Sequence, residues 1–182
     1  MALIHRTLAC IALVMALALT APLTAQAQDK ENTLYLDTKY GRVVIKLLPD
    51  IAPNHVKRIK TLTREGFYDG LKFHRVIDGF MAQTGDPLGT GAGGSDLPDL
   101  KAEFSNHAFK RGTIGMARTN NPNSANSQFF ITFGNAPWLN RQYTVWGEVT
   151  SGMEYIDQIN KGEPPRNPDV IVKMQVAADA AE

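Results

Sequence analysis

The sequence predicts an all-β domain, and three of its features lead to that prediction. Short runs rich in β-branched and aromatic residues recur along most of the chain, separated by turns that contain Gly, Asn or Pro. Only two segments show the apolar spacing that is typical of an amphipathic helix. No repeat or linker interrupts residues 28–182, which indicates one domain over that range. These features favour a β-sandwich or a β-barrel, and the pattern alone leaves both open.

Residues 1–27 have the pattern of a secretory signal peptide. His5 and Arg6 precede an uncharged apolar run over residues 8–19, and Ala25-Gln26-Ala27 provides a small-x-small cleavage site. The apolar run is shorter than the roughly 20 residues with which a helix crosses a bilayer. We therefore expect cleavage after Ala27. The mature protein is then expected in the periplasm, or outside the cell if the host has no outer membrane.

The composition of the mature chain argues against several classes of function. The single cysteine, Cys10, lies in the predicted signal peptide, so the mature chain would have no disulfide and no thiolate. The formal charge of +1 falls to about zero without Arg6, which gives no reason to expect nucleic acid or a membrane as partner. His55, His74 and His107 lack the spacing of metal ligands, so we expect no metal and no cofactor. No heptad pattern favours association, and a monomer is expected.

The mature chain is predicted to begin with a β-hairpin followed by a helix. Residues 33–36 and 42–48 are β-prone and flank a turn at Lys39-Tyr40-Gly41. Helical spacing begins near Pro53, and Gly66 is a typical C-terminal stop. Later strands are predicted at 113–117, 128–133, 143–149 and 170–176, and a second helix at 152–160. The Gly-rich segment 85–94 lacks the Gly-Lys-Ser/Thr ending of a phosphate-binding loop and is interpreted as a surface loop.

A second hairpin is predicted within residues 73–86, where two apolar runs flank Asp78-Gly79. Pairing across a two-residue turn would place Arg75 and Phe80 on one face, with Met81 and Gln83 on the other. A longer turn or a bulge would change this register. Arg75 is unusual in such a strand, because a charge in apolar surroundings requires solvent, a partner or a ligand.

Several motifs, in order along the chain, resemble the cyclophilin family of peptidyl-prolyl cis-trans isomerases. The longest is FHRVIDGFMAQTGD at residues 73–86. The others are GTIGMA at 112–117, NSQFFI at 126–131, Trp138-Leu139, and VWGEV at 145–149. Their order and rough spacing agree over nearly the whole mature chain, so the signal is specific. The chain is similar to exported bacterial members of the family.

The resemblance implies a closed eight-stranded antiparallel β-barrel capped by two α-helices, with the active groove on its outer face. By position, Arg75 matches the family's catalytic arginine. The walls of the proline pocket are matched by Phe80, Met81, Phe130 and Leu139. Other groove positions are matched by Gln83 and Gln128, which orient the peptide, by Ala117 and Arg118, whose loop pairs with the substrate backbone, and by Trp138, the rim residue associated with cyclosporin binding.

The chain departs from many eukaryotic members at two groove positions. Tyr143 stands where they carry histidine, and Arg118 stands where they often carry asparagine. These departures bear on peptide preference and on the binding of cyclosporin-type cyclic peptides.

The resemblance implies an enzyme that accelerates X-Pro rotation in proline-containing peptides and unfolded exported proteins, without a covalent intermediate or a metal. The alternative is a proline-peptide binding module or chaperone. Such a module would need the apolar pocket but not Arg75.

Overall fold

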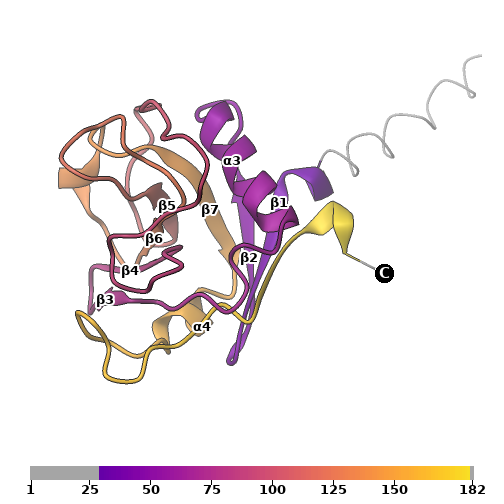
Figure 1. Ribbon diagram of the computed structural model, residues 1–182, viewed down its shortest axis with the longest axis vertical. Helices are drawn as coiled ribbons and strands as arrows, with labels where there is room; N and C mark the ends of the chain where they lie inside the picture. The colour runs from indigo at the N-terminus through magenta and orange to yellow at the C-terminus, as the bar shows by residue number, and fades with distance from the viewer. Residues whose placement is uncertain (1–28, 181–182) are drawn as a thin grey trace, which may run out of the picture.

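The computed structural model describes residues 29–180, and within them eight strands form one antiparallel sheet (Figure 1). The strands are β1 (Thr33–Thr38), β2 (Gly41–Leu47), β3 (Arg75–Ile77), β4 (Met81–Thr84), β5 (Thr113–Met116), β6 (Phe129–Thr132), β7 (Val145–Ser151) and β8 (Lys173–Val176). Their order across the sheet is β3-β4-β6-β5-β7-β2-β1-β8. The all-β prediction is therefore confirmed. The predicted signal peptide lies outside the described residues.

The sheet is open, so the closed barrel that the resemblance implied is wrong for this chain. Its two edge strands, β3 and β8, are not paired with each other. The segments before them meet only through a bridge between Lys72 and Val170 and a few single hydrogen bonds nearby. The ladder does not close because the outer edge of β3 pairs instead with a loop, through Val76 and Gly162. The result is a curled sheet with two ends.

The two predicted helices are present, as α3 (Pro53–Arg64) and α4 (Met153–Asp157). Helical residues at 29–31 add a third helix, one more than expected. Two 3₁₀ turns, η1 (Pro137–Leu139) and η2 (Ala177–Asp179), complete the elements of the described chain. α3 lies against β7 and β8, and α4 lies against β2. Between residues 29 and 180, no helix is long and apolar enough to cross a bilayer.

The hairpin of β3 and β4 has a three-residue turn, which corrects the register expected from a two-residue turn. Ile77 pairs with Met81, so Asp78, Gly79 and Phe80 form the connection. Arg75 therefore lies opposite Gln83, and these two side chains share a face. Phe80 is not on the Arg75 face of a strand but in the turn, where Gly79 has the positive φ of +68° that the turn requires.

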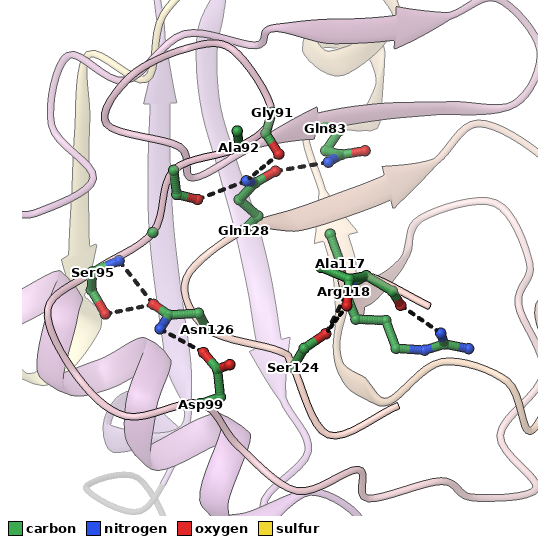
Figure 2. A pocket seen from close by; sticks show the side chains of 13 residues that line it. Gln83, Gly91, Ala92, Ser95, Asp99, Ala117, Arg118, Ser124, Asn126 and Gln128 are labelled. Atoms are coloured by element: carbon green, nitrogen blue, oxygen red, sulfur yellow. Dashed lines mark hydrogen bonds between the residues drawn. The ribbon is translucent and has the colours of Figure 1, made fainter. Parts of the chain in front are cut away.

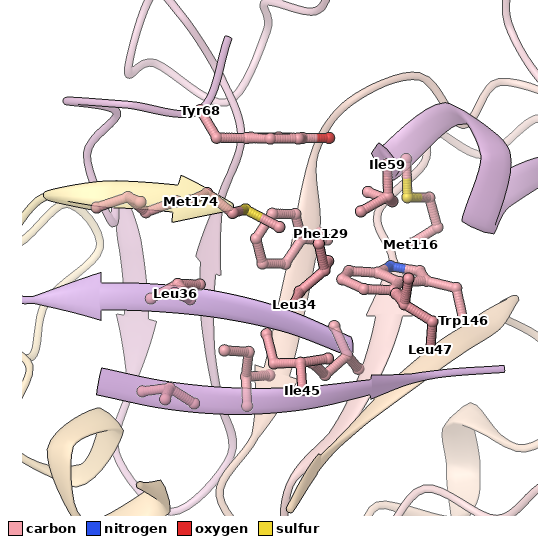
Figure 3. Close-up of a cluster of buried hydrophobic side chains, with 14 of the residues drawn as sticks. Leu34, Leu36, Ile45, Leu47, Ile59, Tyr68, Met116, Phe129, Trp146 and Met174 are labelled. Atoms are coloured by element: carbon pink, nitrogen blue, oxygen red, sulfur yellow. The ribbon is translucent and has the colours of Figure 1, made fainter. Parts of the chain in front are cut away.

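Both faces of the central strands are buried, by two separate apolar clusters. The inner cluster is the main core, in which the ring of Phe129 packs edge-on against Trp146, with centroids 5.3 Å apart (Figure 3). A second cluster lies on the opposite face, and we call it the outer cluster. Its buried members are Met81, Phe109, Phe130, Ala136, Leu139 and Val145. β6 joins the two, because Phe129 and Ile131 enter the core whereas Phe130 belongs to the outer cluster.

The N-terminus of α3 is held by a carboxylate from a distant loop. Glu103 accepts hydrogen bonds from the backbone N–H groups of Asn54 and His55, at 3.1 and 3.0 Å, and lies 2.6 Å from His55 Nδ1. The other ring nitrogen of His55 is buried without a partner within the described chain. A charged imidazolium would bury an N–H there without an acceptor. The ring is therefore neutral, with its Nδ1–H donated to Glu103.

Acid should weaken this anchor in two stages. Burial lowers the pKa of His55 below its ordinary value of 6.5, against the opposing pull of Glu103. Below about pH 6.5 the unfolded chain therefore binds a proton that the folded chain rejects, and stability falls as pH falls. Burial alone would raise the pKa of Glu103, but hydrogen bonds led by that from His55 outweigh it, and the pKa lies below 4.5. A further loss of stability follows below about pH 4.5.

We expect the free energy of unfolding, measured with urea, to fall between pH 7.5 and 5.5, and His55 should contribute about 1 kcal/mol of this fall. His55→Gln should be less stable at pH 7.5 but should lose less stability on acidification. His74, which burial also leaves with a lowered pKa, should supply the slope that remains. An unchanged pH slope in His55→Gln would contradict the neutral assignment.

Candidate active site

One row of cross-strand neighbours runs across the outer face of the sheet, over five strands. Arg75 on β3 pairs with Gln83 on β4, and Gln83 pairs with Phe130 on β6. Phe130 pairs with Gly115 on β5, which pairs in turn with Val145 on β7. Directly paired residues in antiparallel strands point to the same face, about 5 Å apart. We call this set the outer row, and it places a cation, an amide, an aromatic ring and a gap side by side.

The outer cluster brings together the residues that match the proline pocket. Met81, Phe130 and Leu139 are buried in it, with 2%, 5% and 7% of their surface exposed. Side chains that pack against its rim include Phe80, Ala117 and Tyr143. Trp138 is 63% exposed and tilts toward Phe80, with ring centroids 5.7 Å apart. The structure thus gathers every apolar site residue of the sequence analysis into one surface.

Gly115 makes room for the Phe130 ring. A Cβ atom at this position would lie 2.6 Å from Phe130 Cζ and 2.7 Å from Phe109 Cε1. The two phenyl rings stack over the gap, with centroids 5.7 Å apart and planes inclined by 22°. Tyr143 packs edge-on against Phe130, with centroids 5.6 Å apart. The position of the Phe130 ring is therefore set by its contacts with Phe109 and Tyr143 and by the space at Gly115.

Arg118 covers Tyr143 at one end of this surface. Its guanidinium lies over the ring of Tyr143, 4.6 Å from the centroid, and donates to the carbonyls of Gln142 and Thr119. The two positions that depart from many eukaryotic relatives therefore contact each other. The backbone N–H of Ala117 donates to Gln128 O at 2.9 Å. The backbone of Arg118, in contrast, makes no hydrogen bond within the described residues, so it is available to a peptide.

A frame of polar side chains and loop carbonyls lies around Gln83 and Gln128, as Figure 2 shows. Gln83 Nε2 donates to Gln128 Oε1 at 2.9 Å, and Gln128 Nε2 donates to the carbonyls of Gly91 and Gly93 at 3.0 and 2.8 Å. These residues border a cavity of about 500 Å³ that also includes Asp99. The two glutamines that match peptide-orienting positions are thus joined to each other and to the Gly-rich loop.

The carboxylate of Asp86 stabilises the Gly-rich loop through hydrogen bonds to its backbone. It is 1% exposed and accepts hydrogen bonds from the backbone N–H groups of Leu88, Thr90 and Gly91, at 2.8, 2.9 and 2.6 Å. Burial would raise the pKa of Asp86, but these N–H donors outweigh it and lower the pKa below 3.8. The backbone N–H groups of the loop therefore bind the carboxylate of Asp86, and the positive-φ glycines allow the turn that this binding requires.

Arg75 lies at the edge of the site rather than in the outer cluster. Its Nε donates to Glu163 Oε2 at 2.8 Å, on the side of β3 away from Gln83. The same side chain borders a second cavity, of about 590 Å³, together with Gln83, Arg118 and Glu163. Within residues 29–180, Nε is the only nitrogen of this guanidinium that makes a hydrogen bond. The terminal nitrogens remain available to a ligand in the cavity.

Three residues of this site were not predicted from the sequence. Glu163 was not singled out, because it is far from Arg75 in sequence and no local pattern marks it. Asp86 ends the motif at residues 73–86, but no role was predicted for it. Asn126, whose Oδ1 accepts from Ser95 N and Ser95 Oγ, ties the Gly-rich loop to the segment before β6. Residues 29–180 contain no group of three or more His, Cys, Asp or Glu that could hold a metal.

Comparisons with known proteins agree with this geometry. The family described as cyclophilin type peptidyl-prolyl cis-trans isomerase/CLD matches residues 33–176. A probable peptidyl-prolyl cis-trans isomerase of Brucella suis biovar 1 is 52% identical over 195 residues, covering 98% of this chain and 99% of that protein.

Two solved structures show the same fold. The cyclophilin AquaCyp293 from Hirschia baltica has a TM-score of 0.78 at 32% identity, with 84% of this chain and 76% of that chain covered. A cyclophilin type isomerase from Cryptosporidium parvum, crystallised in the presence of the dipeptide Ala-Pro, has a TM-score of 0.74 at 30% identity, with 79% and 98% covered. Sequence, fold and the residues of the outer face lead to the same conclusion, that this chain belongs to the cyclophilin family of peptidyl-prolyl cis-trans isomerases.

Proposed function

We propose that this isomerase accelerates rotation about X-Pro bonds in exported proteins, holding the proline ring on the outer cluster and donating to the prolyl nitrogen from Arg75. The observation that carries the proposal is the outer row. It sets Arg75, Gln83 and Phe130 in successive strands on one face, so an apolar ring site and a cation lie about two strand spacings apart, roughly 10 Å. A long arginine side chain can span part of that distance.

The reaction needs little from the protein beyond these groups. An X-Pro bond rotates slowly because amide resonance gives a barrier of about 18–20 kcal/mol. At the twisted transition state the resonance is lost, and the lone pair localises on the prolyl nitrogen. A guanidinium N–H can donate to that lone pair but has little to bind in the planar amide. The interaction is therefore stronger in the transition state, which is the condition for raising the rate.

The remaining groove residues have positioning roles in this proposal. Met81, Phe130 and Leu139 contact the proline ring, and Phe80 with Trp138 forms the exposed rim. Gln83 and Gln128 orient the flanking peptide through neutral hydrogen bonds, and the free backbone of Arg118 pairs with it. The crystals of the Cryptosporidium parvum relative with Ala-Pro support a proline-containing peptide as ligand. Exposed Trp138 supports cyclosporin-type cyclic peptides as a further candidate ligand.

Removing the Arg75 guanidinium should separate rate from binding. For Arg75→Ala we expect kcat/KM on a short X-Pro peptide to fall on the order of 10²-fold, as when other transition-state donors are removed. The affinity for the peptide should change less than about threefold, because the apolar surface is intact. Exchange between the isomers, followed by NMR, measures the rate, and calorimetry measures the affinity.

Arg75→Lys is the matched variant, since it keeps the charge and loses the planar fork. It should recover only part of the rate. A wild-type protein that binds peptide without accelerating its isomerisation would instead support the binding-module alternative. An unchanged rate in Arg75→Ala would remove the role proposed for the guanidinium.

Filling the gap at Gly115 should displace the proline site. In Gly115→Ala the new methyl group must move the Phe130 ring, so we expect peptide affinity to weaken by about tenfold. Gly134→Ala is the control, because a Cβ there meets only Gly79 O at 3.7 Å, an ordinary contact. Equal peptide affinity in the two variants, measured by calorimetry, would show that the proline ring does not bind at Phe130.

Export is proposed from the sequence of residues 1–27. We expect the protein purified from the cell envelope of its host to begin at residue 28, as determined by mass spectrometry of the intact chain. A full-length chain that starts at Met1 and stays in the cytoplasm would contradict both the cleavage and the proposed localisation.

A further inference from the structure

Glu163 is the nearest charged partner of the proposed catalytic arginine, and the backbone places it there. The N–H and C=O groups of Val76 exchange two hydrogen bonds, both 2.8 Å long, with those of Gly162. In this antiparallel bridge the residue before Val76 lies opposite the residue after Gly162. Arg75 and Glu163 are therefore cross-strand neighbours, and the 2.8 Å contact between Nε and Oε2 follows from the main chain.

The loop that carries Glu163 has a determined shape. Gly162 has a φ of +147°, and a Cβ there would lie 2.6 Å from Pro165 Cα and 2.9 Å from Pro165 N. Only glycine fits this position. Just before this glycine, Asn160 N donates to the buried carboxylate of Asp169 at 2.9 Å. The carboxylate of Glu163 thus projects from a fixed backbone toward β3.

A single bond to Nε is enough to orient the guanidinium. The group is planar, so the direction of its Nε–H bond together with that of its Cδ–Nε bond sets the plane of the whole fork. Glu163 binds it on the edge of the sheet, and this leaves the terminal nitrogens for the cavity that Arg75 shares with Gln83 and Arg118. Without this contact, a side chain that is 43% exposed would sample several rotamers.

We propose that Glu163 is a positioning residue for Arg75, which holds the guanidinium plane so that its terminal N–H groups can reach the prolyl nitrogen at the transition state. This inference rests on the proposed function, because it requires that Arg75 act on the reacting bond. Glu163 itself does not touch the reacting atoms. Its contribution should therefore appear in kcat and vanish when Arg75 is absent.

The test is a double-mutant cycle with a matched control pair. We expect Glu163→Ala to lower kcat about threefold to tenfold while peptide affinity stays within twofold, because orientation rather than binding is lost. Glu163→Gln keeps an acceptor and should recover part of the loss. In the Arg75→Ala background, Glu163→Ala should have no further effect.

Asp157→Ala is the control, since Asp157 pairs with Arg111 at 2.6 Å away from the groove. The exposures are similar, 48% and 42% for Arg111 and Asp157 against 43% and 50% for Arg75 and Glu163. The Asp157→Ala variant should keep the wild-type kcat. Its melting temperature should fall by at least as much as that of Glu163→Ala.

Each other result would overturn the inference. A wild-type or raised kcat in Glu163→Ala would show that the pair does not aid the reaction. A loss that persists in the Arg75→Ala background, or that Asp157→Ala reproduces, would assign it to stability. If Arg75→Ala itself retains the wild-type rate, the proposed function fails together with this inference; if only the Glu163 variants are wild-type, the inference fails alone.

Discussion

The cross-strand register of the outer face is the constraint on which the rest of the site depends. In a β-sheet, a slip of one residue moves every side chain to the opposite face. Here β6 prevents such a slip, because all four of its residues are buried and both of its faces are packed. Phe129 and Ile131 fill the core, whereas Phe130 fills the outer cluster. A slip would place Phe130 in the core and remove the ring from the groove, so the stability of the fold and the geometry of the site share one cause.

The polar side of the groove is also fixed in orientation, by hydrogen bonds around a charged carboxylate rather than by apolar packing. Gln83 and Gln128 are neutral amides whose orientation would be free on an ordinary surface. Gln128 is held by the carbonyls of Gly91 and Gly93, and Gln83 donates to Gln128 in turn. The loop that presents those carbonyls is organised around the ionised Asp86. Because hydrogen bonds from backbone N–H groups keep this carboxylate charged well below neutral pH, the frame does not change in the physiological range. The substrate meets donors and acceptors whose directions are already set.

The sequence predicted what depends on local pattern, and the structure supplied what depends on distant pairing. Strands such as β1 and β2 and the helix α3 follow from β-propensity, from periodicity and from stops such as Gly66. The residues that match the groove could be named from motifs, and the structure gathers the apolar ones into one cluster. The turn at Asp78–Phe80 was harder, because Asp-Gly is typical of a two-residue turn, whereas the pairing of β4 with β3 and β6 leaves three residues in the connection.

Closure of the sheet and the partner of Arg75 could not be predicted for a common physical reason. Both depend on which segment covers the outer edge of β3. That segment is distant from β3 in the chain, so no local pattern identifies it. The loop at Gly162 takes the edge at Val76, and this leaves β8 unpaired with β3.

That loop also explains how a charged side chain can sit at the border of an apolar groove. An exposed edge strand invites pairing with other chains, and proteins avoid this by short edges, by covering loops and by charges. β3 has all three: it is three residues long, it is bridged by Gly162, and it carries Arg75. The two hydrogen bonds that protect the edge also bring Glu163 against the guanidinium, so the charge is half-solvated and paired while it still borders the cavity. A cation held in this way loses less hydration than one in a closed pocket, and its terminal N–H groups remain free for a ligand. The edge position of Arg75 is therefore a consequence of the fold and at the same time suits the reaction proposed for it.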